Sequence, residues 1–499
     1  MRFQVGIKPS PSSSLTICPT TLAKSLKNSR DQSLLRAQSS SDSSSVSHST
    51  ATTPTTTTDP RKKHDLKLQA TLARSISEIG QQAWDSCHDN SNPFLSYEFL
   101  NALEDSGSCT PTQGWQPQHF VIRGTPEREK DEHEEQVVLA CVPLYLKGHS
   151  YGEYVFDSAW AQAFDRHFAA PSDNGYYPKM QSCVPFTPVT GSRILVKPGK
   201  HKEEVARAVA NTLGTLPQEL SFSSLHCTFN TEEEWLLMSK CGGLRRTGVQ
   251  YHWHNDSTPA HDGTGNNSTK SNLYANFGDF EAALQQKRRK AIRQERKKVS
   301  NAGLRVQRLS GADVQDSGLW DAFYKFYLNT IDRKWGTAYL TREFFELLSE
   351  RMSDRVLLVT ATESNSTTQG PLSLPTMAGA AARGAKKQRP VAAALNLLGS
   401  DTIYGRNWGC AAGDEIKGLH FELCFYQAIE HAIENKFKRA EAGAQGEHKL
   451  ARGYLPTLTY SSHFIVNDGF RYAIEDFLRQ ERSEIEYYAE IATRDSPYK

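Results

Sequence analysis

The chain has 499 residues, 38% of them hydrophobic, and a formal net charge of +2. Mean hydropathy is −0.58, which is low for a chain that is folded throughout, so part of it is expected to be disordered. No apolar run reaches the roughly 18 residues that a membrane span needs, and nine cysteines without CxxC spacing do not form a disulfide framework. A membrane-spanning protein and a disulfide-stapled secreted domain are therefore excluded, and the length predicts two or three domains.

Residues 1–62 are rich in Ser and Thr, and their basic residues outnumber their acidic ones. No compact apolar segment of the kind found in secretory signals is present. The composition indicates an organelle transit peptide, in the chloroplast (plastid stroma) rather than the mitochondrion. The alternative is a plain disordered tail, and either reading removes this N-terminal extension from the folded part.

Residues 63–254 are predicted to form a first mixed α/β unit. The spacing of apolar residues predicts a helix over 66–84 and a short amphipathic helix over 97–104. Strands are expected at 119–122, 137–146, 151–156, 193–196 and 220–229, with helices at 157–168 and 202–213.

Residues 255–300 are predicted to be a polar loop, about 255–272, followed by a connecting helix that becomes strongly basic. One reading is a solvated surface helix. The other is a contact with a phosphate-rich partner, such as a tRNA or the phosphates of an activated donor. The candidate contacts are Lys287, Arg288, Arg289 and Arg293. No interleaved aromatic pattern accompanies them, so sequence-specific readout of nucleic acid is not predicted.

Residues 301–480 are predicted to form a second unit, with a low-complexity insertion at about 361–388 and a C-terminal tail over 481–499. The elements expected here are helices at 319–330, 341–352 and 418–433 and strands at 355–360, 391–398, 402–408, 438–442 and 454–466. Segments 142–152 and 394–405 share an order of strand, turn and strand with Tyr-Gly, followed by a helix and a strand. A duplicated α/β unit is the simplest explanation.

The stretch Glu441–Lys449 (EAGAQGEHK) concentrates reactive side chains between two glycines. Glycine permits close approach of a ligand to the backbone and unusual dihedral angles. Glu and His exchange protons near neutral pH. This stretch is therefore the first candidate for a functional site.

Several segments resemble the FemAB-like family, labelled peptidoglycan biosynthesis/recognition, over about residues 76–466. They are Tyr274–Phe280 with the basic run after it, Asn407–Gly409, Leu419–Gln427, Glu441–Lys449 and Pro456–His463. The resemblance implies an α/β (α+β) fold of tandem GNAT-like units, as in acyl-CoA N-acyltransferases, with mixed central sheets flanked by helices. Members of the wider Fem group transfer amino acids from aminoacyl-tRNA to the peptide of a lipid-linked peptidoglycan precursor. The expected donor is thus acyl-CoA or aminoacyl-tRNA, with no further cofactor.

In such a unit the central sheet splays between two parallel strands, and the donor carbonyl lies in the splay. The resemblance places strands 402–408 and 438–442 at its borders, with the helix that starts near Lys417 and Gly418 beside the donor. A cationic side chain and a residue without Cβ suit that position.

Acyl transfer to an amine needs a base, donors for the tetrahedral oxyanion and a proton for the leaving group. Glu441 is the first candidate base and His448 the second, and Tyr404 is a candidate proton donor. The alternatives are that Glu441 is a structural carboxylate paired with Lys449 or Arg452, and that His448 belongs to a surface turn.

The candidate donor- or substrate-binding residues extend over the same region. They are Arg406, Asn407, Lys417, Gly418, Gly443, Gln445, Gly446, Lys449 and Arg452. No metal site is predicted, because His420, His448 and His463 lack metal-ligand spacing such as HExxH.

The expected function is that of an N-acyltransferase or aminoacyltransferase acting on a small-molecule or peptide amine, with tRNA as a candidate partner. The alternative is a non-catalytic binding protein of the same fold that recognises a glycopeptide or RNA.

Overall fold

The computed structural model describes residues 15–17, 68–124, 136–169, 175–256, 273–333, 337–363, 390–411, 416–443 and 446–499. Nearly all of the predicted transit segment, most of the polar loop and of the low-complexity insertion, and Gln445 lie outside the described residues.

Eleven strands of the described residues form one mixed sheet. In spatial order they are β11 (Leu304–Leu309), β12 (Val356–Glu363), β13 (Pro390–Leu398), β14 (Thr402–Cys410), β15 (Arg439–Glu441), β10 (Leu244–His254), β16 (Leu455–Ile465), β9 (Ser224–Asn230), β7 (Lys179–Ser182), β6 (Leu144–Lys147) and β3 (Trp115–Pro117). The pairs β14–β15 and β7–β9 are parallel, and the other pairs are antiparallel.

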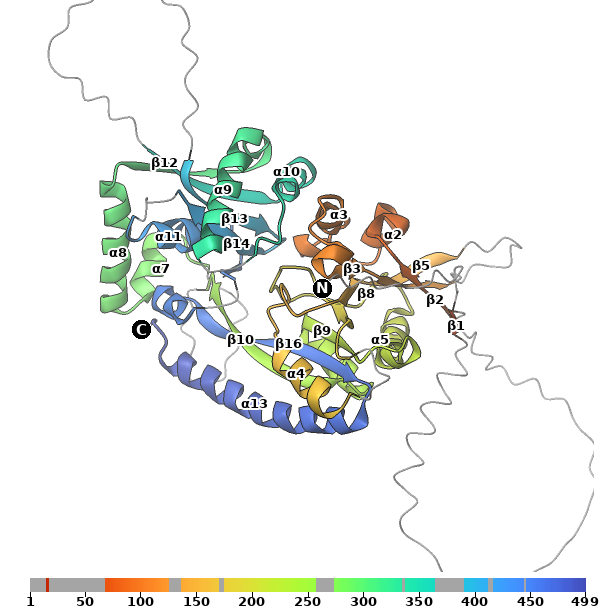
Figure 1. The fold of residues 1–499 in the computed structure, drawn as a ribbon. Helices are drawn as coiled ribbons and strands as arrows, with labels where there is room; N and C mark the ends of the chain where they lie inside the picture. The colour runs from red at the N-terminus through yellow and green to blue at the C-terminus, as the bar shows by residue number, and fades with distance from the viewer. Residues whose placement is uncertain are drawn as a thin grey trace, which may run out of the picture.

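The sheet joins two similar units by a reciprocal exchange of strands. In each unit a pair of parallel strands lies next to an antiparallel strand in the sheet. That antiparallel strand comes from the other half of the chain. Strand β10 follows the first unit in sequence and pairs with β15 of the second, whereas β16 pairs with β9 of the first. The exchanged strands β10 and β16 pair with each other at the centre, where Figure 1 shows them spanning the two lobes.

A second sheet belongs to the first unit alone. Its strands are β1 (Leu15–Ile17), β2 (Leu68–Ala73), β4 (His119–Gly124), β5 (Val137–Val142) and β8 (Leu195–Val196), in that order. Strand β5 continues into β6 of the large sheet after Pro143, which lacks the N–H that an unbroken ladder would require.

Helices flank both units. The α-helices are α2 (Gln81–Asp85), α3 (Tyr97–Asp105), α4 (Ser158–His167), α5 (Lys202–Glu219), α6 (Glu232–Lys240), α7 (Phe277–Ala283), α8 (Gln286–Asn301), α9 (Ser317–Arg333), α10 (Arg342–Arg351), α11 (Leu419–Phe421), α12 (Gln427–Glu434) and α13 (Asp468–Arg494). A π-helical turn, Glu422–Tyr426, joins α11 to α12. The 3-10 turns are Ile76–Glu78, Pro93–Leu95, Pro111–Gln113, Gly311–Val314 and Glu447–Arg452. Within the described ranges, no helix is both long and apolar enough to cross a membrane.

One hydrophobic core connects the two units. It contains Phe94 and Phe99 from the first unit and Phe344 and Tyr404 from the second. The ring of Phe94 contacts that of Tyr404 edge-on at 5.2 Å, and Phe99 contacts Phe344 at 5.7 Å. This core closes one face of the sheet beside the parallel strands β14 and β15.

Three sequence predictions are wrong. The predicted helix over 66–84 begins instead with strand β2, whose ladder to β4 overrides the helical spacing. The predicted strand 151–156 is an irregular loop, because two carboxylates in and next to it are bound by Lys179. The predicted tail 481–499 is largely the second half of α13, which is capped by the Asn467 side chain.

Candidate functional site

The parallel strands β14 and β15 part at Glu441. Their ladder has three pairs and ends with Tyr404 opposite Glu441. Strand β14 continues to Cys410, whereas β15 ends at Glu441. Beside the last pair, a Cβ on Gly405 would lie 3.1 Å from the Glu441 carbonyl oxygen, so glycine permits the close approach of the two backbones.

The Glu441 carboxylate is buried where the strands part. The residue is 5% exposed, and neither carboxylate oxygen has a hydrogen-bond partner among the described residues. Its nearest cation is Arg439, whose Nε lies 3.3 Å from Oε1. Burial raises the pKa of Glu441 to about 7, and nearby Arg439, Arg406 and Lys449 limit the rise. A carboxyl with this pKa takes up and releases protons at neutral pH.

His252 of the exchanged strand β10 faces Glu441 across the antiparallel ladder. Its Nε2 lies 3.8 Å from Glu441 Oε2 and 3.2 Å from Gln250 Oε1. Burial lowers the pKa of His252 well below its ordinary value, so the ring is neutral. His252 was not predicted as a site residue. The alternation of polar and aromatic residues over 250–254 indicates a half-polar strand face, but it does not specify which strand lies beside that face.

Tyr404 and Arg406 lie on β14 beside the core between the units. Tyr404 is 4% exposed, and burial raises the pKa of its hydroxyl. Arg406 donates to the carbonyl of Phe186, lies over the ring of Phe94 at 5.5 Å, and has its pKa lowered by burial. Asn407 follows it and, with Arg406, lines a small, mostly apolar cavity. These contacts bring Tyr404 and Arg406 to the Glu441 region and hold Arg406 inside the protein.

The other cationic candidates are held by protein groups. Lys449 is 1% exposed and donates to the Gly443 carbonyl at 2.6 Å, and burial lowers its pKa to about 8. Arg452 donates to Glu295 Oε1 at 2.6 Å and stacks on the ring of Phe421 at 3.3 Å. Both side chains therefore brace the segment that follows β15, and among the described residues neither forms the ion pair with Glu441 that the structural alternative requires.

His448 does not meet Glu441 in any contact among the described residues. Its exposed ring packs near Phe421 and Phe425, at centroid distances of 5.9 Å each. Burial, Arg452 and Lys449 lower the pKa of His448. The structure therefore separates the two candidate bases.

The candidate glycines have different surroundings. Gly443 and Gly446 have φ of +76° and +122°, and only the Gly446 Cβ position meets an obstacle, the ring of His448. Gly418 has φ of +97°, and a Cβ there would lie 3.2 Å from the Glu295 carbonyl oxygen. The backbone at Gly418 therefore packs closely against helix α8. The neighbouring Lys417 side chain is exposed.

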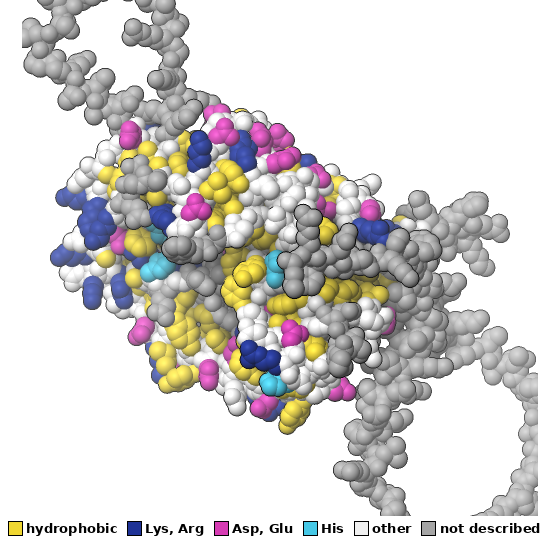
Figure 2. Space-filling view, viewed as in Figure 1, with side chains coloured by type: hydrophobic (Ala, Val, Ile, Leu, Met, Phe, Trp, Pro, Cys, Tyr) yellow, Lys and Arg dark blue, Asp and Glu magenta, His cyan; other side chains and the backbone are white. Residues whose placement is uncertain are grey.

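Helix α8 carries basic residues of two kinds. Arg296 is bound by Glu422 and Glu430, both at 3.1 Å, and Arg293 pairs with Glu281 at 3.0 Å. Several other basic residues make no ion pair with the described residues: Lys287, Arg288, Arg289, Lys290, Lys297 and Lys298. Figure 2 shows Lys and Arg side chains gathered on the edge of the molecule where α8 lies.

One face of α8 borders a surface groove of about 590 Å³. Its lining is Ala282, Gln286, Arg289, Lys290, Arg293, Gln294 and Lys297. These residues recur at the helical spacing of three or four, so the basic side chains form a stripe along one side of the helix.

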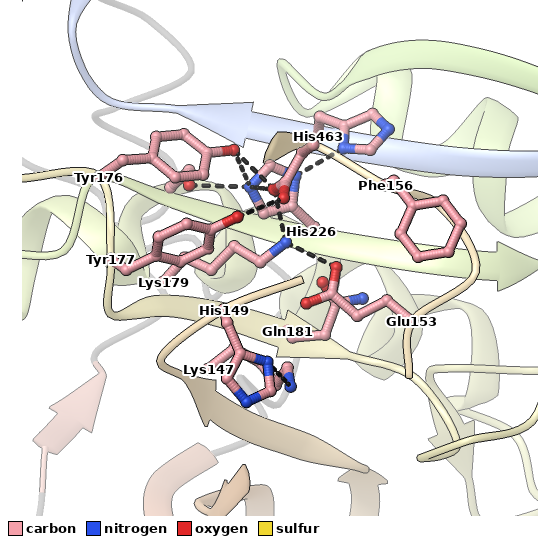
Figure 3. Close-up of polar contacts among 12 residues, drawn as sticks. Lys147, His149, Glu153, Phe156, Tyr176, Tyr177, Lys179, Gln181, His226 and His463 are labelled. Atoms are coloured by element: carbon pink, nitrogen blue, oxygen red, sulfur yellow. Dashed lines mark hydrogen bonds and ion pairs between the residues drawn. The ribbon is translucent and has the colours of Figure 1, made fainter. Parts of the chain in front are cut away.

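A buried polar cluster in the first unit was not predicted. Lys179 of β7 donates to Glu153 Oε2 at 2.7 Å and to Asp157 Oδ2 at 2.5 Å, all three being almost fully buried. The hydroxyls of Tyr176 and Tyr177 donate to Asp157, each at 2.8 Å. Figure 3 shows the Lys179 ammonium between the rings of Tyr176 and Tyr177 on one side and the Glu153 carboxylate on the other.

The same cluster contains two histidines on neighbouring strands. The Nδ1 atoms of His226 and His463 lie 2.6 Å apart, so one ring donates its proton to the other. Burial lowers the pKa of both rings well below the ordinary value. His463 of β16 lies opposite His226 of β9, just as His252 of β10 lies opposite Glu441 of β15. Each unit therefore has a buried pair of titratable residues, and one member of each pair comes from an exchanged strand.

Comparison with protein families gives one match. The FemAB-like family, described as peptidoglycan biosynthesis/recognition, matches residues 75–378 and 374–499. The match covers most of the chain, so this protein belongs to the FemAB-like family, and the predicted α/β fold with a mixed central sheet flanked by helices is confirmed. No curated protein matches the chain.

Among solved structures, the chain is similar to FemX, with 10% identity, a TM-score of 0.43, and coverage of 80% of this chain and 98% of FemX. It is also similar to the C-terminal domain of a putative lysylphosphatidylglycerol synthetase from Agrobacterium fabrum, with 8% identity, a TM-score of 0.41, and coverage of 81% and 97%. A tandem GNAT protein of the clavulanic acid biosynthesis pathway has 9% identity, a TM-score of 0.34, and coverage of 80% and 98%.

Proposed function

We propose that this FemAB-like protein transfers an acyl or aminoacyl group from an activated donor to an amine, with Glu441 as the general base. The observation that carries the proposal is the Glu441 carboxyl itself. It is buried where β14 and β15 part, has no hydrogen-bond partner among the described residues, and has a pKa of about 7.

The reaction requires a free amine, because an alkyl amine with a pKa of roughly 10.4 is mostly protonated at neutral pH. Glu441 takes the amine proton, and the nitrogen attacks the donor carbonyl. A C–N bond forms, and the C–S bond of a thioester or the C–O bond of an ester breaks. The leaving thiolate or alkoxide takes up a proton, for which the Tyr404 hydroxyl is the candidate donor because Tyr404 lies opposite Glu441 in the ladder. The attacking nitrogen then loses its second proton, which restores the Tyr404 hydroxyl, and Glu441 releases the first proton to solvent.

Neighbouring groups keep Glu441 ready for this role. The neutral His252 ring lies 3.8 Å from one carboxylate oxygen, whereas Arg439, 3.3 Å from the other, favours the charged form. A base whose pKa lies near the working pH combines a substantial deprotonated fraction with enough basicity to take the proton.

The test is transfer of a labelled group by purified protein to an amine, comparing wild type with Glu441→Gln. Acetyl-CoA and a mixture of aminoacyl-tRNAs serve as the two donors. Loss of transfer in Glu441→Gln, with an unchanged unfolding temperature near pH 5, supports the proposal. Equal transfer by both proteins would overturn it.

The stripe on α8 favours an RNA-borne donor over acyl-CoA. Its basic side chains follow one helix of 16 residues, which is about 24 Å long at 1.5 Å per residue. That length suits several successive phosphates of a nucleic acid better than the compact phosphates of one nucleotide. Donor competition decides the point: uncharged tRNA should inhibit transfer, and free CoA should not.

A non-catalytic binding protein is the second candidate function. The closed surroundings of Glu441 favour it, since Glu441 and His252 are only 5% and 2% exposed. In that case Glu441→Gln leaves the function in cells intact, whereas filling the cavities near β10 removes it.

For localisation, the composition of residues 1–62 supports import into the plastid stroma, with the mitochondrion second.

A further inference from the structure

A cavity of about 320 Å³ lies against the centre of the exchanged strands. Its lining combines residues of β9, β10 and β16, of the loop before α4, and of α13. They are Tyr154, Val155, Phe156, Phe229, Arg246, Thr247, Gly248, Val249, Gln250, Thr459, Ser461, Glu481 and Ile485. This volume is at the small end of the range for ligand pockets, about 300 to 1,000 Å³, and fits one small molecule.

The cavity lies midway between the two buried titratable pairs. Gly248 of β10 is paired with Thr459 of β16, and both line the cavity. His252 follows Gly248 by four residues, and His463 follows Thr459 by four residues, in opposite directions because the strands are antiparallel. The exchange of strands therefore creates a pocket at the centre of the pseudo-symmetric sheet.

The cluster around Lys179 fixes one wall of this cavity. Tyr154 and Phe156 lie between Glu153 and Asp157, whose carboxylates are both bound to the Lys179 ammonium. The Tyr154 hydroxyl is also 2.8 Å from that of Tyr339 in the second unit. Figure 3 shows the Phe156 ring well apart from the tyrosine rings of the cluster.

The lining mixes apolar and polar side chains and carries little net charge. The guanidinium of Arg246 donates through Nε and Nη2 to Glu481, at 2.8 and 2.7 Å, so the two charges cancel. The Thr247 hydroxyl is buried without a hydrogen-bond partner among the described residues. Hydroxyl and amide groups beside aromatic faces suit a ligand with hydroxyl groups and flat apolar faces, such as a sugar ring.

One end of the cavity lies at Gln250, which is separated from the proposed base by the His252 ring. Gln250 lines the cavity, and its Oε1 lies 3.2 Å from Nε2 of His252, which in turn lies 3.8 Å from Glu441. The Gln250 amide oxygen keeps a second lone pair beyond its contact with His252, so this end favours an ammonium or amine group.

We propose that this cavity binds the acceptor, and that the acceptor is a small hydroxyl-rich amine of the amino-sugar class. The proposal rests on the transferase function proposed above. The amine occupies the end at Gln250, and the ring lies against Phe156 and Thr459.

Saturation-transfer NMR on the purified full chain tests the proposal, with D-glucosamine as the probe. D-glucose and diglycine are the comparison ligands, since the first lacks the amine and the second lacks the ring. Phe156→Ala removes an exposed aromatic wall, and Tyr151→Ala is the matched control because Tyr151 is an exposed aromatic of the same loop that does not line the cavity.

We expect glucosamine to bind more tightly than either comparison ligand, Phe156→Ala to weaken its binding at least tenfold, and Tyr151→Ala to change it less than twofold. Absence of glucosamine binding, tighter binding of diglycine, or equal binding by Phe156→Ala would overturn the proposal. Glu441→Gln separates the two hypotheses. If Glu441→Gln transfers acyl groups as wild type does, the catalytic proposal fails. The affinity of Phe156→Ala for glucosamine tests separately whether the cavity binds the acceptor.

Discussion

Glu441 and His252 lie opposite each other in the ladder of β15 and β10, with His252 Nε2 3.8 Å from Glu441 Oε2. The two residues come from different halves of the chain, because β10 follows the first unit and completes the sheet of the second. The exchange of strands thus places the neutral ring of one unit beside the carboxylate of the other.

The first prediction concerns activity. Glu441→Gln should lower the transfer rate by about 10²- to 10⁴-fold, which is the range for loss of a general base. Wild-type activity should rise with pH through about 7, since the deprotonated carboxylate is the active form. The variant should lack this rise. A pH profile measured with a weakly basic amine, so that the acceptor does not itself titrate, provides the check.

The second prediction concerns stability. The pKa of Glu441 is raised from 4.5 to about 7 on folding, so the folded state binds a proton that the unfolded state has released between those values. The free energy of unfolding therefore falls as pH rises from about 4.5 to 7. At 1.36 kcal/mol per pKa unit the loss is about 3 kcal/mol. Glu441→Gln should remove this loss.

Thermal unfolding of wild type and Glu441→Gln at pH 5 and pH 8 measures the effect. The variant should gain stability relative to wild type at pH 8 and little at pH 5. A gain of the same size at both pH values would show that ionisation of Glu441 is not its source.

The sequence predicted the strands that border the site but not all of the site. Predicted strands 402–408 and 438–442 correspond to β14 and β15, because short apolar runs between turn residues determine such strands locally. Glu441 was selected because it was expected at a strand end, which β15 confirms, whereas its catalytic role stays a prediction. His252 was missed because its role depends on the exchange of β10 and β16, a long-range pairing that no local pattern encodes.

The loop over residues 151–156 shows the converse. Its aromatic and β-branched residues favour a strand, yet Lys179 fixes it as a loop through Glu153 and Asp157. A charged contact between distant residues here overrides local propensity, and the strand that follows β6 in the sheet is β7 instead.

The third prediction concerns α8. Lys290→Ala and Lys297→Ala should each weaken binding of tRNA and reduce the slope of log affinity against log salt by about 1, as expected for loss of one phosphate contact. Lys202→Ala on α5 is the control, since Lys202 is an exposed lysine on another helix. Filter binding over a range of salt concentrations gives the slopes. Equal slopes for all variants would rule out α8 as an RNA contact.

The fourth prediction concerns Gly418. Gly418→Ala should destabilise the protein, because the residue has φ of +97° and its new Cβ would lie 3.2 Å from the Glu295 carbonyl oxygen on α8. Gly303→Ala is a matched comparison with φ of +68° and open space around the Cβ position. The strain of positive φ alone costs about 1 to 2 kcal/mol, so only Gly418→Ala should exceed it. Denaturant unfolding of both variants gives the difference, and equal losses would show that α8 moves away freely.

The fifth prediction concerns Lys179. Burial disfavours its charge, but Glu153 and Asp157 outweigh burial and raise its pKa, so the ammonium stays charged. Lys179→Met leaves two buried carboxylates without their cation and should cost about 3 to 5 kcal/mol, as for other broken buried ion pairs. Adding Asp157→Asn to Lys179→Met should restore part of the loss, because the second change removes one uncompensated charge. Urea unfolding of the single and double variants provides the measurement. If the double variant is no more stable than Lys179→Met, the loss comes from packing of the lysine stem and the cluster does not act through its charges.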